Sequence, residues 1–421
     1  MQILFVLVAI GGALYFGFAK RRFDAFCVAY GSALIYFSPG FVGTVPYASK
    51  GYWIDPMLPI VPSAYGVMTL VLAAIWVTAH LYKRGGNVTA KLHSDSTMPY
   101  VSTAFTVLAL LGFAGTLATT GLQTLQMTEK ELIMEQLNRS YTLWSGAASI
   151  GVVVAFASRK YVEMTICALL VGGCMYVGFR LEFVISALAI FFVYAAADKP
   201  QRLVIRFRKW LFPLTIVMFF VLIFKVIYIG VKFDDYWFIF ERLSDPDTYE
   251  NVLFYSEPFY IQGTLNEVLA SDFSVGLDHL ADIFFLAIPR SSELGITAIS
   301  FNDLFQPALF PQAVAFGLAN NIWAQMWSAG GWLLLFLFVL VFCAAIAAGE
   351  SIRRKVGLEA HAIVVVALMY WCFYIHRNDL IFQLLIERNI LIISFVAYLL
   401  SRVINILIRG KSERLNQREF F

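Results

Sequence analysis

Charged side chains are scarce in this sequence. They make up 14 % of its 421 residues, against roughly 25 % in a soluble globular protein. Hydrophobic residues reach 60 %, and a water-soluble fold of this size cannot hide so much apolar surface. The composition therefore excludes a chain of soluble domains and predicts an all-α polytopic membrane protein.

Patterns that bind metals or form disulfides are also missing. The five cysteines lie in apolar stretches without a CxxC pair, which excludes a thiolate metal site and predicts buried apolar side chains. The five histidines show no HExxH spacing, which argues against a zinc hydrolase. We expect no metal site and no cofactor.

The first apolar run, 2–19, has no basic residue in front of it, and Lys20, Arg21 and Arg22 follow it. This order is the reverse of that in a secretory signal peptide. We therefore predict a first membrane helix whose N-terminus lies outside.

Eleven segments of the chain are long and apolar enough to approach the roughly 20 residues of a membrane span. Alternating crossings place 21 of the 31 lysines and arginines on one side, which the positive-inside rule makes cytoplasmic. The N-terminus is then outside and the C-terminus inside. The predicted spans are 2–19, 23–40, 63–82, 100–120, 141–158, 161–178, 181–197, 211–230, 330–349, 358–376 and 389–408.

One outer loop, 232–317, is much longer than the others. It holds thirteen acidic residues against Lys232, Arg242 and Arg290, a net charge of −10. We therefore divide the chain into spans one to eight (1–231), this loop (232–317), and spans nine to eleven with a cytoplasmic tail (318–421). An acidic loop of this length with few Gly or Ser is not typical of a linker.

Helical signals recur in and after this loop. Ser256 is a candidate N-cap, with Glu257 and Pro258 opening a helix that runs to about residue 270. A second helix begins near Gly276, places Leu277, Leu280, Phe284 and Ile288 on one face, and stops at Pro289. A third, over 319–327, is broken by Gly330 and Gly331. We expect amphipathic helices on the outer face of the membrane, beside a cavity.

Several charges remain at the outer ends of the spans, where they cost free energy unless they face a partner or a cavity. Each also has a purely structural explanation. Lys225 can reach outward or pair with a carboxylate, Arg388 can form a salt bridge, Arg377 with Asp379 can anchor the interface, and Arg290 can favour a helix dipole. A tight turn gains nothing from a buried Arg180. These charged residues are Arg180, Lys225, Arg290, His376, Arg377, Asp379, Glu387 and Arg388.

Arginines beside carboxylates predict a specific chemistry. The planar guanidinium suits two-point binding of a phosphate or diphosphate, and a carboxylate suits removal of a proton from a hydroxyl. At a membrane surface, this combination indicates group transfer from a lipid phosphate or diphosphate donor.

Short motifs support this interpretation. Gly178-Phe179-Arg180 forms a G-x-R turn, Glu257-Pro258 and Pro289-Arg290 follow in the long loop, and a polar helix over 320–325 precedes Gly330-Gly331. His376-Arg377-Asn378-Asp379 then ends a span. In these motifs and in its topology, the chain resembles the O-antigen polymerases (Wzy), the oligosaccharide repeat-unit polymerases of the bacterial envelope.

The resemblance implies a membrane-embedded, GT-C-like glycosyltransferase in the bacterial inner membrane, with its active site facing the periplasm. Undecaprenyl-diphosphate-linked oligosaccharides would be both donor and acceptor. A chain-length regulator is a candidate partner, and no nucleic acid is expected. Arg180, Arg290 and Arg377 would bind the diphosphate, with Arg388 and Lys225 as further candidates. Glu257 is our first choice of base, with His376, Asp379 and His279 in reserve.

Two alternatives stay open. An O-antigen ligase would use the same chemistry but transfer the glycan to a lipid A core. A transporter or flippase for the lipid-linked unit would be expected to show paired repeats and charges at mid-bilayer, whereas the charges here gather at the outer end. Gln325 stands where the resemblance would suggest an acidic residue, which argues against catalysis by its helix.

Overall fold

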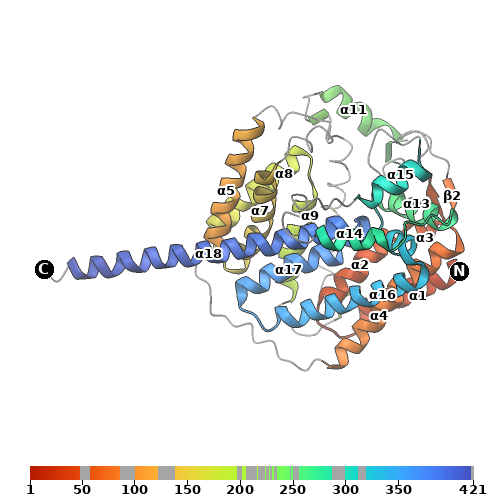
Figure 1. The fold of residues 1–421 in the computed structure, drawn as a ribbon, viewed down its shortest axis with the longest axis horizontal. Coiled ribbons are helices and arrows are strands. Elements are labelled where there is room, and N and C mark those ends of the chain that lie inside the picture. Colours follow the sequence, from red (N-terminus) through yellow and green to blue (C-terminus); the bar gives the residue numbers. More distant parts are fainter. Residues whose placement is uncertain are drawn as a thin grey trace. The chain divides into compact units, whose positions relative to one another are not determined.

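A computed structural model of residues 1–421 shows a helical protein (Figure 1). It describes the chain except 48–56, 86–99, 122–137, 197–201, most of 205–234, 247, 250–255, 287–298, 312–318 and 419–421. The described elements are α1 (Gln2–Phe18), α2 (Ala25–Tyr36), α3 (Pro39–Val42), β1 (Thr44–Pro46), β2 (Met57–Pro59), α4 (Pro62–Gly85), α5 (Val101–Thr120), α7 (Arg139–Ala157), α8 (Tyr161–Val177), α9 (Leu181–Ala196), α11 (Tyr236–Ser244), α13 (Glu257–Ala270), α14 (Asp278–Leu286), α15 (Phe301–Leu309), α16 (Ile322–Arg353), α17 (Leu358–Cys372), the 3₁₀ turn η3 (Tyr374–Arg377) and α18 (Leu380–Arg418).

Six helices in the described part of the chain are long and apolar enough to cross a membrane. They are α4, α5, α7, α16, α17 continued through η3, and α18. Four shorter apolar helices, α1, α2, α8 and α9, fall on further predicted spans. The predicted polytopic helical membrane protein is confirmed at this level. The span predicted over 211–230 lies mostly outside the described residues, and the number and direction of crossings stay predictions.

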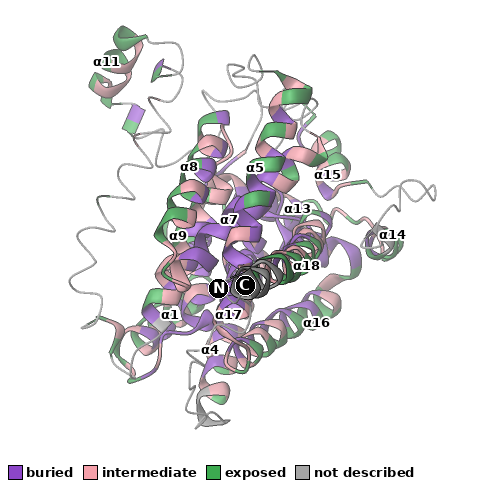
Figure 2. Cartoon of the chain, turned by 90° about the vertical axis from the view of Figure 1, so that its left-hand side faces the viewer, coloured by how far each residue is buried: buried purple, intermediate pink, exposed green. Residues whose placement is uncertain are grey.

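Large apolar side chains cover the outside of the long helices. On α16, Leu333 is 72 % exposed, and on α18, Leu391 is 71 % exposed. Figure 2 shows exposed residues recurring along both helices. Such continuous apolar faces are costly in water but favourable against lipid.

The described contacts divide the chain into two compact units, each built from separate stretches. Unit 1 comprises 1–87, 198–347 and 371–385, and unit 2 comprises 88–197, 348–370 and 386–421. The predicted boundaries at 231/232 and 317/318 concern membrane topology, and they stay predictions.

Unit 2 contains a closely packed group of helices, α5, α7, α8 and α9 (Figure 1). Twelve of the nineteen residues of α7 are buried, and the indole Nε1–H of Trp144 donates to the carbonyl of Leu170 on α8 over 3.1 Å. The predicted turn between α8 and α9 is also present. The amides of Gly178 and Phe179 donate to the carbonyls of Met175 and Cys174 in the pattern of a Schellman motif.

In unit 1, α13 forms a buried centre. It begins after Ser256, with Glu257 and Pro258 in its first turn, which confirms the predicted start and end. However, nine of its fourteen residues are buried, so α13 is not the one-sided amphipathic helix we predicted. It packs against β1, α2, α4, α15 and η3, and this enclosure on several sides explains why both apolar and small polar residues are buried along it.

The next predicted helix is also present, as α14, with a different buried face. Leu280 and Ile283 are buried, whereas Leu277 and Phe284 are 61 % and 59 % exposed. The predicted stop at Pro289 lies outside the described residues.

A short antiparallel hairpin of β1 and β2 packs on α13. The side chain of Asn266 on α13 accepts from the amide of Val61 over 2.8 Å and donates to the carbonyl of Pro59. A methyl group at Gly263 would lie 2.6 Å from the carbonyl oxygen of Pro46. Gly263 therefore permits the close approach that fixes α13 against the hairpin.

The predicted break in the polar helix after residue 327 is confirmed. α16 changes direction at Gly330 and Gly331, and Gly331 has φ +62° and ψ −156°, a conformation open almost only to glycine. The segment before the break carries Asn321, Trp323 and Gln325 into the interior of unit 1, where all three are fully buried.

The contact at Gly263 generates a stability prediction. Gly263→Ala should lower the unfolding free energy of the detergent-solubilised protein by about 1–3 kcal/mol, because the new methyl group displaces β1. The measurement is the thermal unfolding temperature, which should fall with it. Gly172→Ala is the matched control, since it lies inside α8 with no heavy atom within 4 Å of the added group. It should be neutral or stabilising by up to about 1 kcal/mol. Equal effects of the two substitutions would contradict the proposed close approach.

Candidate functional site

The turn that joins α17 to α18 carries His376, Arg377 and Asp379, and neighbouring side chains hold it in place. The indole Nε1–H of Trp323 on α16 donates to Nδ1 of His376 over 3.2 Å. His376 is 0 % exposed, and Tyr36 stacks on its ring with a centroid separation of 5.6 Å. Because Nδ1 accepts from the indole, the ring is neutral with its proton on Nε2. This enclosure favours a positioning role for His376 over that of a base.

Asp379 acts as a cap for two helices. One carboxylate oxygen accepts from the amide of Phe382 at the start of α18 over 2.9 Å, and the other accepts from the amide of Phe301 at the start of α15 over 3.2 Å. Burial raises the pKa of Asp379, and these two hydrogen bonds act in the opposite direction. Since both oxygens hold backbone amides, the geometry favours a structural role.

Gln325 links the same turn to α14. Its Oε1 accepts from the amide of Leu380 over 2.8 Å, and its Nε2 lies 3.1 Å from Nε2 of His279. An amide nitrogen can only donate, so His279 is a neutral acceptor in this contact. A glutamate at this position could not donate to His279, which gives a physical reason for an amide where an acid was expected.

Arg377 and Glu257 form an ion pair between Nε of the guanidinium and Oε1 of the carboxylate. The two residues come from η3 and from the first turn of α13, so the pair joins two of the sequence motifs. The side chains are 30 % and 37 % exposed. The structure therefore brings our first-choice base and a predicted diphosphate ligand into direct contact at a partly open position.

Two tyrosines, Tyr374 and Tyr36, lie near this pair. The guanidinium of Arg377 lies 5.2 Å from the ring centre of Tyr374, a favourable cation–π distance. Tyr36 on α2 is close enough to interact electrostatically with Glu257, Arg377 and Tyr374. Tyr36 and Tyr374 were not predicted as site residues, because aromatic residues near span ends are most often part of an interfacial belt, and Trp323 was predicted only as part of the 320–325 motif.

The other predicted diphosphate ligands belong to unit 2 or lie outside the described residues. Arg180 lies half-buried in the turn between α8 and α9, and Arg388 lies on α18, both in unit 2. Lys225 and Arg290 lie outside the described residues. Their predicted roles as diphosphate ligands stay predictions.

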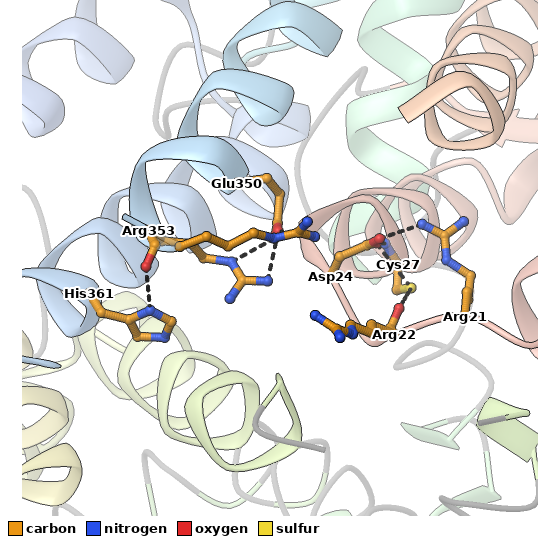
Figure 3. Close-up of polar contacts among 8 residues, drawn as sticks. Arg21, Arg22, Asp24, Cys27, Glu350, Arg353 and His361 are labelled. Atoms are coloured by element: carbon orange, nitrogen blue, oxygen red, sulfur yellow. Dashed lines mark hydrogen bonds and ion pairs between the residues drawn. The ribbon is translucent and has the colours of Figure 1, made fainter. Parts of the chain in front are cut away.

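Two further ion pairs among the described residues are local and buried (Figure 3). In unit 1, Arg21 pairs with Asp24 over 2.5 Å, and Asp24 also accepts from the amide of Cys27 at the start of α2. In unit 2, Glu350 accepts two hydrogen bonds from Arg353, at 2.9 and 2.6 Å. The partners in each case are three residues apart and at most 8 % exposed. These pairs stabilise helix ends. Their partners are close in sequence and buried, whereas Arg377 and Glu257 come from distant segments and are partly exposed.

The contact between Gln325 and His279 predicts a pH dependence. Burial lowers the pKa of His279, against the opposing effect of Asp282, so the unfolded chain binds this proton more readily than the folded chain. Stability should therefore fall as the pH drops from about 7.5 to 5, through the ordinary histidine pKa of about 6.5. His279→Gln should flatten this part of the profile of unfolding temperature against pH. Parallel profiles for the two proteins would count against the assignment.

The caps made by Asp379 predict a loss of stability rather than of chemistry. Asp379→Ala should lower the unfolding free energy by about 2–4 kcal/mol, because it removes a helix cap and leaves a buried amide unpaired. Asp379→Ser can still cap α18 and should recover part of the loss, as measured by thermal unfolding in detergent. If the Asp379→Ala protein is as stable as the parent, the capping role is contradicted and Asp379 is again a candidate base.

Comparisons of the chain with protein-family models, with curated proteins and with solved structures find no match. Within unit 1, the site is a partly exposed Arg377–Glu257 pair beside His376 and Asp379, which are buried and accept hydrogen bonds from Trp323 and from backbone amides.

Proposed function

We propose that this protein is a membrane-embedded glycosyltransferase that polymerises undecaprenyl-diphosphate-linked oligosaccharide repeat units. The observation that carries the proposal is the Arg377–Glu257 pair. It places a cationic group suited to a diphosphate beside a carboxylate suited to a hydroxyl proton, at the end of a helix long enough to span a membrane. The resemblance of the surrounding motifs to O-antigen polymerases supplies the substrate class.

The proposed membrane arrangement has eleven crossings, an external N-terminus and a cytoplasmic C-terminus. The supporting evidence is the agreement of ten described helices with predicted spans, together with the sorting of basic residues. The 374–380 turn and the start of α13 then face the periplasm of a bacterial inner membrane. Lipid-linked substrates reach this level from the outer leaflet.

In the proposed reaction, Arg377 binds the donor's diphosphate and stabilises the charge that develops as the bond from the anomeric carbon to the diphosphate oxygen breaks. Glu257 takes the proton from the acceptor sugar's hydroxyl, whose oxygen forms the new bond to that anomeric carbon. The polyprenyl diphosphate leaves with the electron pair of the broken bond. Arg180 and the other predicted basic residues are candidates for further contacts to the diphosphate.

The decisive experiment supplies a purified lipid-linked repeat unit to the reconstituted protein and resolves the products by glycan length. A ladder of longer glycans on the lipid carrier is expected. A single transfer onto lipid A core would instead identify a ligase, and translocation into vesicles without a new glycosidic bond would identify a transporter.

Substitutions at the pair should abolish the ladder while the protein still folds. Glu257→Gln should reduce the rate by about 10²–10⁴-fold, as expected for loss of a general base. Arg377→Lys, which keeps the charge but loses the planar fork, should reduce it by about 10²-fold or more. Arg180→Ala tests the predicted contribution of the turn between α8 and α9.

Glu241→Gln is the matched control for these substitutions, because Glu241 is an exposed carboxylate on α11 of the same long segment. It should leave the ladder unchanged. Full activity of Glu257→Gln would refute the assignment of the base.

A further inference from the structure

We propose that the donor's diphosphate displaces Glu257 from Arg377, so that binding of the donor releases the base for catalysis. This inference rests on the proposed function and adds an order of events to it. The described structure contains the ion pair, and an oxygen that is held by a guanidinium is poorly placed to accept a proton from a sugar hydroxyl.

The exposure of the pair makes the exchange feasible. The side chains of Arg377 and Glu257 are 30 % and 37 % exposed, whereas those of Arg353 and Glu350 are 7 % and 0 % exposed. The contacting atoms, Nε of Arg377 and Oε1 of Glu257, are themselves buried, so the exposed area belongs to the remaining atoms of the two side chains, where a ligand can approach. A diphosphate carries more charge than a carboxylate and can engage several N–H donors of one guanidinium, and such charge-assisted contacts are stronger.

Arg377 has supports that remain after the exchange. Its guanidinium lies over the ring of Tyr374, and the adjacent His376 is held by Trp323 and Tyr36. The recorded contact to Glu257 uses Nε, which is one of five N–H donors of an arginine. The backbone that carries Arg377 is therefore fixed independently of Glu257.

Glu257 is placed to separate from Arg377 at low cost. It stands in the first turn of α13, a helix of fourteen residues, where the helix dipole favours a negative charge. The body of that helix is fixed by contacts that do not involve Glu257, through Asn266 to the hairpin and through Asn321 to the carbonyl of Ile261. A rotation of the Glu257 side chain alone is sufficient to open the pair.

Binding of diphosphate probes to the full-length protein in detergent tests this exchange without any catalysis. Inorganic pyrophosphate and farnesyl diphosphate are the two probes, and Kd is measured at fixed salt. Glu257→Gln should bind both probes about 3–10-fold more tightly than the parent, because the internal competitor is gone. Arg377→Gln should weaken binding by about tenfold or more.

Glu267→Gln removes the same charge from the same helix, near the end opposite to Glu257, and controls for net charge. It should change the affinity less than twofold. Glu257→Asp keeps the charge but shortens the reach to Arg377, so it should also bind more tightly than the parent and provides a second variant should Glu257→Gln fail to fold.

Unchanged or weaker binding by a folded Glu257→Gln or Glu257→Asp protein would overturn the exchange. The proposed function fails by different results. No ladder from the native protein, or equal affinity for pyrophosphate and farnesyl diphosphate, would contradict a lipid-linked donor while leaving a measured gain in affinity intact.

Discussion

Three buried side chains, Asn321, Gln325 and Asp379, satisfy backbone N–H groups at the starts of α16, α18 and α15. Helix starts leave such donors without intrahelical partners, and an unpaired donor inside an apolar protein costs about as much as a lost hydrogen bond. Each of these three side chains is therefore held in position by the backbone amides from which it accepts hydrogen bonds. Together they fix the turn over 374–380, and the position of Arg377 depends on that turn.

Arginine has two distinct uses in this protein. Arg21 and Arg353 pair with carboxylates three residues away and lie within the fold, where the pairs hold helix ends. Arg377 reaches a carboxylate from a distant segment at a partly open position. Burial separates the two uses, because an enclosed pair would lose both its partner and its hydrogen bonds if opened, whereas solvent or a ligand can compensate an exposed one.

Local patterns in the sequence predicted much of the fold and part of the site. Hydrophobic runs located the long helices, Ser256-Glu257-Pro258 located the start of α13, and Gly330-Gly331 located the break in α16. The burial of α13 could not be predicted in this way, because it arises from the packing of a distant hairpin against Gly263. The contact of Glu257 with Arg377 likewise depends on tertiary structure, as does the enclosure of His376 by Trp323 and Tyr36.

The exchange at Arg377 also bears on the release of product. In the proposed reaction, the polyprenyl diphosphate retains after transfer the charge that made the donor bind, so a site built only of cations would hold it tightly. Glu257 is tethered beside Arg377 at a fixed high effective concentration, and once it has passed its proton to solvent it competes for the guanidinium. On this proposal, the carboxylate that accepts the proton during transfer also promotes departure of the spent carrier, and the ion pair is the state that this departure restores.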